Sequence, residues 1–236
     1  AGFPWPTSAK GGGSSIELIP PTLINDFGGN WRSSVNPPDT VFIPRNSTGW
    51  RFRQTPSEPP AAWKQASFDD SGAEWATGGL PAGFIGGTAF SPPVTFATTL
   101  SFGNTADRTR AYYFRKKFNV TTPADLTLNI RRDDGAVVWI NNDASPTVLS
   151  ADAAWAAPYP YTSLAPNATQ VGIYHSFAIP ASKFVSGENI IAIQVHQSST
   201  TSSDLLLDMD LIIPAPKGGS PGTANTNLAA SGSVPP

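Results

Sequence analysis

The stretch YYFRKKFNVTTPADLTLNIRRDDGAVVWI, residues 112–140, decides the fold. In its opening segment Phe114 and Phe118 fall on one face of an extended chain, and Arg115 and Lys117 fall on the other. Side chains alternate between the two faces of a β-strand, so this spacing predicts a strand with one apolar face turned toward a core. The stretch therefore favours a β protein.

The pattern continues on both sides of a turn. Leu126–Arg131 alternates again, Asp133-Asp134-Gly135 supplies turn chemistry, and Ala136–Ile140 is fully apolar. Asn141-Asn142-Asp143 then predicts a second turn, because asparagine accepts left-handed backbone angles. Three further strands are expected downstream, at His175–Pro180, Asn189–Gln197 and Leu205–Ile213.

Composition agrees with many short strands. The chain has 236 residues, with 21 glycines and 24 prolines distributed between the apolar runs. The net charge is -2 and only 14% of residues are charged, so no basic patch indicates a nucleic-acid partner. No apolar stretch approaches the length of a membrane span. Because there is no cysteine, disulfides, thiolate nucleophiles and cysteine metal sites are excluded.

The chain divides into three zones. Residues 1–48 form an extended lead-in rich in proline and glycine, residues 49–213 hold the strands, and residues 214–236 have the composition of a linker or tail. The start lacks the order of charged and apolar residues of a signal peptide. We therefore expect a mature or excised part of a secreted protein.

Several motifs in fixed order resemble one module of large secreted bacterial proteins. They are WRFRQTPSEPPAAWKQASFDDSGAEWATG, AYYFRKKFNV, LTLNIRRDDGAVVWIN, FAIPASKFVSGENIIAIQVHQSS and SSDLLLDMDLI, which extend from Trp50 to Ile213. The module is also found beside glycoside hydrolases. The lead-in SIELIPPTLINDFGGNWRSS resembles the region that follows a lamin-tail domain in such proteins.

The resemblance implies an all-β, antiparallel jelly-roll β-sandwich of the galactose-binding-like type. It is similar to the sugar-binding domain of β-galactosidase-type enzymes. One departure is the second turn, where the family usually has Asn-Gly and this chain has Asn141-Asn142.

The sequence contains no recognisable set of catalytic residues. His175 and His196 are the two histidines, and no nucleophile-elbow motif accompanies Ser198 or Ser199. A glycosidase needs two carboxylates flanking a cleft, and the four glutamates are scattered. We expect a protein that is not an enzyme, with structural roles for both histidines.

The most specific polar motif is Asp133-Asp134-Gly135. Adjacent aspartates before glycine occur in flocculin-type adhesin modules, where they bind calcium and sugar hydroxyls together. The alternative is a turn in which one aspartate caps backbone amides. Asp133 and Asp134 are thus candidate calcium ligands, and Asp134 is a candidate sugar ligand.

A second acidic cluster comprises Asp204, Asp208 and Asp210. The alternation places Asp208 and Asp210 on one face of a strand. The expected explanation is a solvated strand face, with a structural calcium ion as the alternative.

Aromatic residues give the other candidate site. Trp155, Tyr159 and Tyr161 lie in AAWAAPYPYTS, a loop with prolines, where rigid rings suit stacking against sugars. A loop folded back over the end of the sandwich would bury the same rings. Trp50, Trp63, Trp75 and Trp139 are expected in the core or at strand edges.

The sequence favours a non-catalytic carbohydrate-binding module of an extracellular or cell-surface protein, with bacterial origin indicated. Its partners would be a polysaccharide and either neighbouring domains or copies of itself. The alternative is a structural or adhesive bead of a surface fibre without sugar recognition.

Overall fold

The computed structural model describes residues 15–18, 22, 24, 26–34, 38–86, 90–149, 155, 157–166 and 173–215. The chain forms two compact units. One unit comprises Ala1–Thr40 with Pro214–Pro236, and the other comprises Val41–Ile213. No helix among the described residues is long and apolar enough to cross a membrane.

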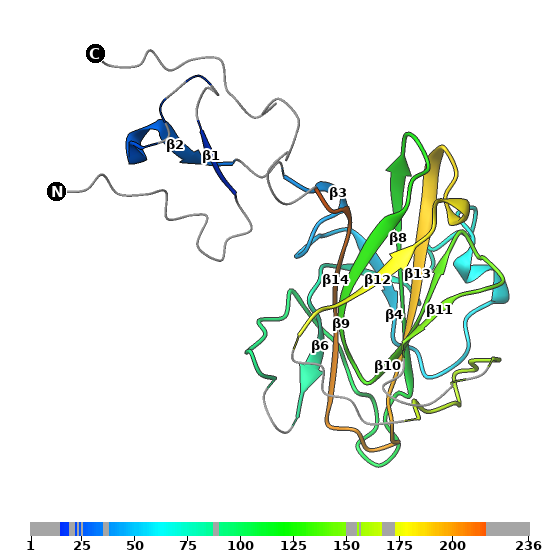
Figure 1. Ribbon diagram of the computed structural model, residues 1–236. Helices are drawn as coiled ribbons and strands as arrows, with labels where there is room; N and C mark the ends of the chain where they lie inside the picture. Colours follow the sequence, from blue (N-terminus) through cyan, green and yellow to red (C-terminus); the bar gives the residue numbers. More distant parts are fainter. Residues whose placement is uncertain are drawn as a thin grey trace. The chain divides into compact units, whose positions relative to one another are not determined.

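The larger unit is a sandwich of two sheets (Figure 1). Sheet I contains, in spatial order, β11 (Thr147–Leu149), β10 (Gly135–Ile140), β13 (Gly187–His196), β8 (Ala111–Val120), β4 (Trp50–Arg53) and β5 (Ala76–Gly78). Sheet II contains β12 (His175–Ile179), β9 (Leu126–Asp133), β14 (Asp204–Ile213), β6 (Ala82–Ile85) and β7 (Thr98–Thr99), and β3 (Thr40–Ile43) also pairs with β14. The β6–β7 pair is parallel, whereas the central ladders are antiparallel. The prediction of an all-β jelly-roll sandwich is confirmed.

Alternation along the strands builds the core between the sheets. From sheet I, β8 contributes Phe114 and Phe118, and β10 contributes Val138. From sheet II, β9 contributes Leu128 and β14 contributes Leu207, and both side chains are fully buried. Burial of apolar side chains from both sheets is the main stabilising contribution to the sandwich.

The opposite face of sheet I is covered as well. Trp63 comes from η3 (Ala61–Lys64), Trp75 precedes β5, and Tyr113 and Trp139 come from β8 and β10. The four rings form a second buried cluster, and Trp63 contacts Trp75, Tyr113 and Trp139 at centroid distances of 6.2, 5.3 and 5.8 Å. Trp50 is buried in the core between the sheets, so all four tryptophans expected in the core or at strand edges are buried.

The second turn uses left-handed asparagines. Asn141 and Asn142 have φ angles of 53° and 58° after β10. Two asparagines in left-handed backbone conformations therefore form this turn without a glycine.

The sandwich unit begins before residue 49, the predicted boundary. β3 pairs with β14, and its Ile43 is completely buried in the core. In the smaller unit, β1 (Ile16–Leu18) pairs with β2 (Trp31–Ser33), which η2 (Gly28–Asn30) precedes. The tail from residue 216 onward and the lead-in up to residue 14 lie outside the described residues.

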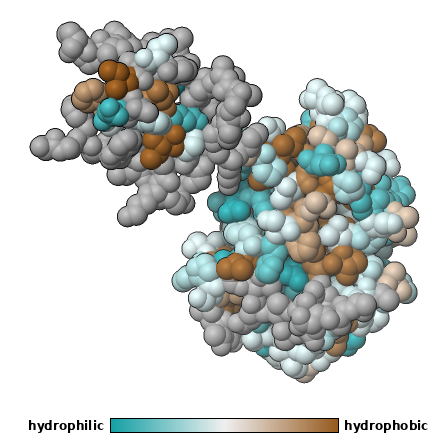
Figure 2. Space-filling model, viewed as in Figure 1, coloured by the Kyte–Doolittle hydropathy of each residue, from teal (hydrophilic) through white to brown (hydrophobic). Residues whose placement is uncertain are grey.

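The exposed apolar residues of the sandwich unit are dispersed. The larger ones among the described residues are Val41, Ile85, Ile173 and Val185. On the face shown in Figure 2, hydrophobic groups of this unit are interrupted by polar ones. That face does not present one broad apolar docking surface.

Candidate functional site

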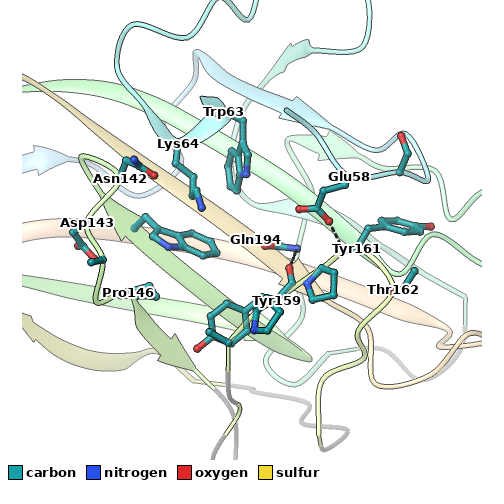
Figure 3. Close-up of a pocket in the computed structure, with 16 residues that line it drawn as sticks. Glu58, Trp63, Lys64, Asn142, Asp143, Pro146, Tyr159, Tyr161, Thr162 and Gln194 are labelled. Atoms are coloured by element: carbon teal, nitrogen blue, oxygen red, sulfur yellow. Dashed lines mark hydrogen bonds between the residues drawn. The ribbon is translucent and has the colours of Figure 1, made fainter. Parts of the chain in front are cut away.

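A groove with a volume of about 770 Å³ lies over the outer face of sheet I (Figure 3). Its walls come from the segment around η3, the turn after β10, and the loop of residues 157–162. Aromatic, amide and charged side chains line it together. They are Glu58, Trp63, Lys64, Trp139, Asn142, Asp143, Tyr159, Tyr161 and Gln194.

The strands of sheet I supply the floor of the groove. Trp139 on β10 and Gln194 on β13 project from the same face of the sheet. Tyr159 meets the Trp139 ring edge-on, with centroids 6.2 Å apart. The floor is thus made of aromatic carbon beside one amide group.

Two contacts hold the loop that forms one wall. Gln194 donates from Nε2 to the carbonyl oxygen of Tyr159 at 3.0 Å. Glu58 accepts a hydrogen bond from the backbone N–H of Tyr161 and one from the Tyr113 hydroxyl at 3.5 Å. These bonds place Tyr159 and Tyr161 in the groove, where each ring is half-buried. Both residues were singled out from the sequence.

Trp155 takes a different position from the other two loop aromatics. Its ring lies edge-on to His196 at 4.8 Å and to Tyr159 at 5.3 Å. A methyl group added at Gly135 would come within 2.9 Å of the Trp155 ring, so the ring lies directly over that glycine. Trp155 packs against the sheet and supports Tyr159, and it does not line the groove.

His196 lies beneath Trp155 and is completely buried. Its Nδ1 donates to the carbonyl oxygen of Ser163 at 2.8 Å. Burial lowers the pKa of His196 to about 4, against a smaller opposing effect of that hydrogen bond. The ring is therefore neutral at physiological pH and tied to the backbone. His175 lies exposed on the edge strand β12.

Asp133 and Asp134 lie at the end of β9 and outside the groove lining. Both are buried, and Asp134 Oδ2 accepts a hydrogen bond from the Ser198 backbone at 2.7 Å. Burial, together with the neighbouring Asp134 charge, raises the pKa of Asp133. The buried guanidinium of Arg132 opposes this shift.

The second acidic cluster is not a solvated strand face, so that expectation is wrong. Asp204, Asp208 and Asp210 are all buried. Asp210 binds Arg45 at 2.5 Å, and Asp208 accepts a hydrogen bond from the Tyr174 hydroxyl. Side chains from other segments cover this face of sheet II, which strand alternation alone does not reveal.

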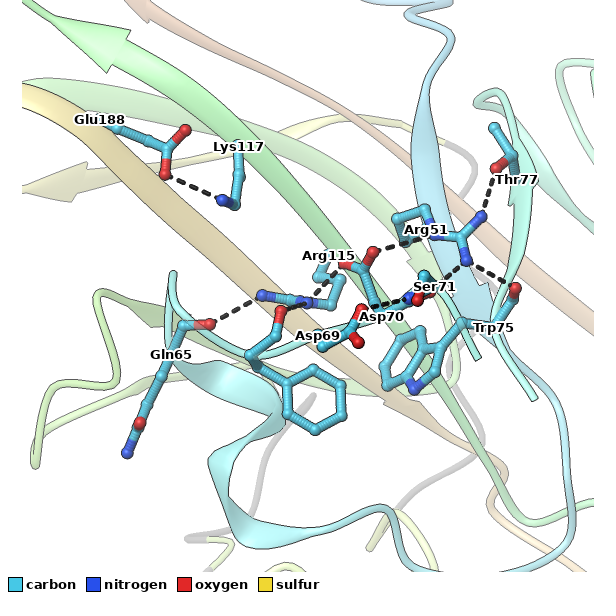
Figure 4. A network of polar contacts seen from close by, with 11 residues as sticks. Arg51, Gln65, Asp69, Asp70, Ser71, Trp75, Thr77, Arg115, Lys117 and Glu188 are labelled. Atoms are coloured by element: carbon cyan, nitrogen blue, oxygen red, sulfur yellow. Dashed lines mark hydrogen bonds and ion pairs between the residues drawn. The ribbon is translucent and has the colours of Figure 1, made fainter. Parts of the chain in front are cut away.

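A polar network holds the segment that carries η3 (Figure 4). Arg115 on β8 donates to the carbonyl oxygens of Gln65 and Phe68 at 2.7 and 3.0 Å, and it pairs with Asp70. Arg51 on β4 binds the other oxygen of Asp70 at 3.2 Å. The network anchors the segment between η3 and β5 to the sheet.

The sequence analysis did not propose Glu58, Lys64 and Gln194 as site residues, and it assigned Asn142 and Asp143 only to a turn. Lys64 is the last residue of η3, which no capping motif announces, and Glu58 lies three residues before that turn. Gln194 follows the apolar residues Ile190–Ile193 of β13. The polar residue within the IIAIQV run was the one signal that could have indicated a special position on the sheet.

By sequence, the chain matches no protein family and no curated protein. Solved structures resemble it remotely. Bacteroides uniformis β-glucuronidase 2, with a covalently bound cyclophellitol-6-carboxylate aziridine, is 13% identical with a TM-score of 0.44, over 75% of this chain and 18% of that chain. A β-glucuronidase from glycoside hydrolase family 2 is 17% identical with a TM-score of 0.40, over 73% and 18%. A proposed β-galactosidase from Bacteroides fragilis is 13% identical with a TM-score of 0.31, over 74% and 23%.

These neighbours are carbohydrate-active enzymes in name, and the chain spans less than a quarter of the length of each. At such low identities and TM-scores, neither the activity nor the substrates of those enzymes transfer to this chain.

Proposed function

We propose that this chain is a non-catalytic carbohydrate-binding module, and that the groove over sheet I is its binding site. The observation that carries the proposal is the combination of half-buried Tyr159 and Tyr161 with the polar groups of Asn142 and Gln194 in one open groove. Ligand sites in proteins combine an apolar lining with a few convergent polar groups in this way.

The chemistry of a pyranose ring matches this lining. Its C–H face is apolar and packs on an aromatic ring, while its hydroxyls exchange hydrogen bonds with amide and carboxylate groups. The Gln194 and Glu58 contacts fix the backbone of the loop. The Tyr159 hydroxyl donates to the Trp155 carbonyl oxygen and the Tyr161 hydroxyl accepts from the Arg110 N–H, each at 3.2 Å, so little side-chain entropy is lost on binding. Rigid aromatic rings on an anchored loop support this function.

We further propose that the protein acts outside the cell as one module of a longer chain, and that it holds that chain close to a polysaccharide. The motifs from Trp50 to Ile213 occur in the same order as in a module of large secreted bacterial proteins, and this resemblance supports an extracellular setting. Because each module would bind weakly, affinity would come from several domains acting together.

Replacement of Tyr159 by alanine tests the site. The variant removes the ring beside Trp139, and truncation of a central aromatic contact is expected to weaken binding at least about fivefold. A glycan array identifies the polysaccharide, and calorimetry measures both proteins. Phe27→Ala is the matched control, because this exposed aromatic residue lies in the other unit.

The same measurement distinguishes carbohydrate binding from the alternative function, a structural role without sugar recognition. A structural bead of a surface fibre would bind no glycan, and neither substitution would change any affinity. Unchanged binding in a folded Tyr159→Ala protein would instead move the site away from the groove.

We also propose that the Asp133–Asp134 pair binds calcium. Among the described residues no three Asp, Glu, His or Cys side chains gather into a metal site. Three buried side-chain oxygens in the described part of the chain nevertheless lack hydrogen-bond partners, and two of them, Asp133 Oδ2 and Gln197 Oε1, lie at this end of the sheet. The pairing of Gly135 with His196 places Gln197 opposite Asp134 at the end of the ladder. Backbone carbonyls and water would complete the oxygen shell that calcium requires.

Calcium should then raise the unfolding midpoint. At a hundredfold excess over the dissociation constant, one bound ion adds about 2.7 kcal/mol of stability. Scanning calorimetry in calcium, in magnesium and in chelator measures the effect, and Asp133→Asn should abolish it. An identical midpoint in calcium and in chelator would show that the pair is a structural turn.

A further inference from the structure

The groove has three charged side chains in its lining, Glu58, Lys64 and Asp143. Glu58 accepts hydrogen bonds from the N–H of Tyr161 and from the Tyr113 hydroxyl. Asp143 is paired with Lys183 at 3.0 Å. Both carboxylates are therefore engaged in holding the walls.

Lys64 differs from these two residues. Its ammonium lies 4.8 Å from the centre of the Trp139 ring, and within the described part of the chain it joins no ion pair. Figure 3 shows the side chain reaching from η3 into the groove, toward Gln194. A cation over an aromatic face at a partly exposed site is a weak interaction, which a carboxylate can replace.

The position of Lys64 has a consequence for ligand choice. A sugar that packs on Trp139 must move the ammonium from the ring. A neutral sugar gives that charge no new partner, whereas a sugar with an acid group pairs with it. Among the groove side chains, Lys64 is the cation placed to distinguish the two ligands.

We propose that the groove selects saccharides that carry a carboxylate, with Lys64 as the residue that recognises the acid group. This inference rests on the proposed carbohydrate-binding function and adds the class of ligand to it. Sulfated sugars share the anionic chemistry and form a separate arm of the test.

The test compares alginate, polygalacturonate and hyaluronan with the carboxyl-reduced form of each polymer, with dextran sulfate beside dextran. Calorimetry measures the intact chain, Lys64→Met and Lys117→Met. Lys117 is the matched control, a half-exposed lysine on β8 outside the groove. The intact chain should bind at least one carboxylated polymer about fivefold more tightly than its reduced form, the size of one partly exposed ion pair.

Lys64→Met should lose this preference and keep its affinity for the reduced polymer, whereas Lys117→Met should behave as the parent does. High salt should shrink the preference, since it screens exposed charges. Equal binding of acidic and reduced polymers overturns the inference and leaves the carbohydrate function intact. A preference for dextran sulfate alone overturns the carboxylate assignment, and binding to no polymer overturns both proposals.

Discussion

Arg115→Ala should lower the free energy of unfolding by about 3 kcal/mol, the cost of removing one partner from a buried ion pair. Arg115 is fully buried, and its guanidinium satisfies Asp70 and the carbonyl oxygens of Gln65 and Phe68. Without it, the two carbonyl oxygens and Asp70 Oδ2 lose this donor, and Arg51 remains as the partner of the other Asp70 oxygen. The segment after η3 then loses most of its anchor. Because η3 carries Trp63 and Lys64 into the groove, binding should fall as well.

Urea unfolding followed by tryptophan fluorescence measures this loss, with extrapolation to water. Lys117→Ala is the control. Lys117 lies two residues after Arg115 on β8, and the substitution removes its exposed ion pair with Glu188. Such pairs contribute at most about 1 kcal/mol. Equal effects of the two substitutions would show that the Arg115 network does not hold the segment.

Gly83→Ala should be as damaging for a different reason. Gly83 lies in β6 opposite Leu206 of β14. A methyl group at Gly83 would come within 1.9 Å of the Leu205 carbonyl oxygen, which is backbone and cannot rotate away. Overpacking costs about 1–3 kcal/mol even where side chains adjust, so a loss of at least about 3 kcal/mol is expected here.

Gly72→Ala serves as its control. No atom lies within 4 Å of the added methyl group at that exposed position, and no positive φ is recorded there. The substitution should be neutral or slightly stabilising, because alanine restricts the unfolded chain. If Gly83→Ala has the same urea unfolding midpoint as the parent protein, β6 and β14 do not approach each other as closely at Gly83 as the structure indicates.

Strand alternation was the part of the fold that the sequence could predict. Phe114 and Phe118 face the core while Arg115 faces the other way, as their spacing indicates. The apolar run of β10 is buried on both faces of sheet I, which explains why it shows no alternation.

Other features depend on segments that meet only in three dimensions. Asp208 and Asp210 alternate as a solvated face would, yet Tyr174 and Arg45 cover them. The loop aromatics also take different positions. Tyr159 and Tyr161 line the groove, whereas Trp155 packs onto the sheet because Gly135 leaves room for its ring. A loop sequence gives no information about which of its rings finds such a space.

The groove depends on long-range contacts in the same way. Glu58 reaches a loop about a hundred residues away to bind the backbone N–H of Tyr161, and this bond sets one wall. Lys64 and Gln194 likewise become part of the groove through contacts with distant residues, Lys64 with the Trp139 ring and Gln194 with the Tyr159 carbonyl oxygen. Residue types alone therefore identified the two tyrosines and not their polar neighbours.

The most direct measurement of the central claim is an amide and indole nuclear magnetic resonance titration with the polysaccharide that the glycan array selects. Binding in the groove should shift the Trp139 indole signal, the Gln194 side-chain amide and the backbone amides of Asn142 and Tyr161. Signals of the Arg115 region on the same sheet should stay in place. Shifts confined to residues outside the groove lining, or no shift with any glycan, would contradict the assignment of this groove as a carbohydrate-binding site.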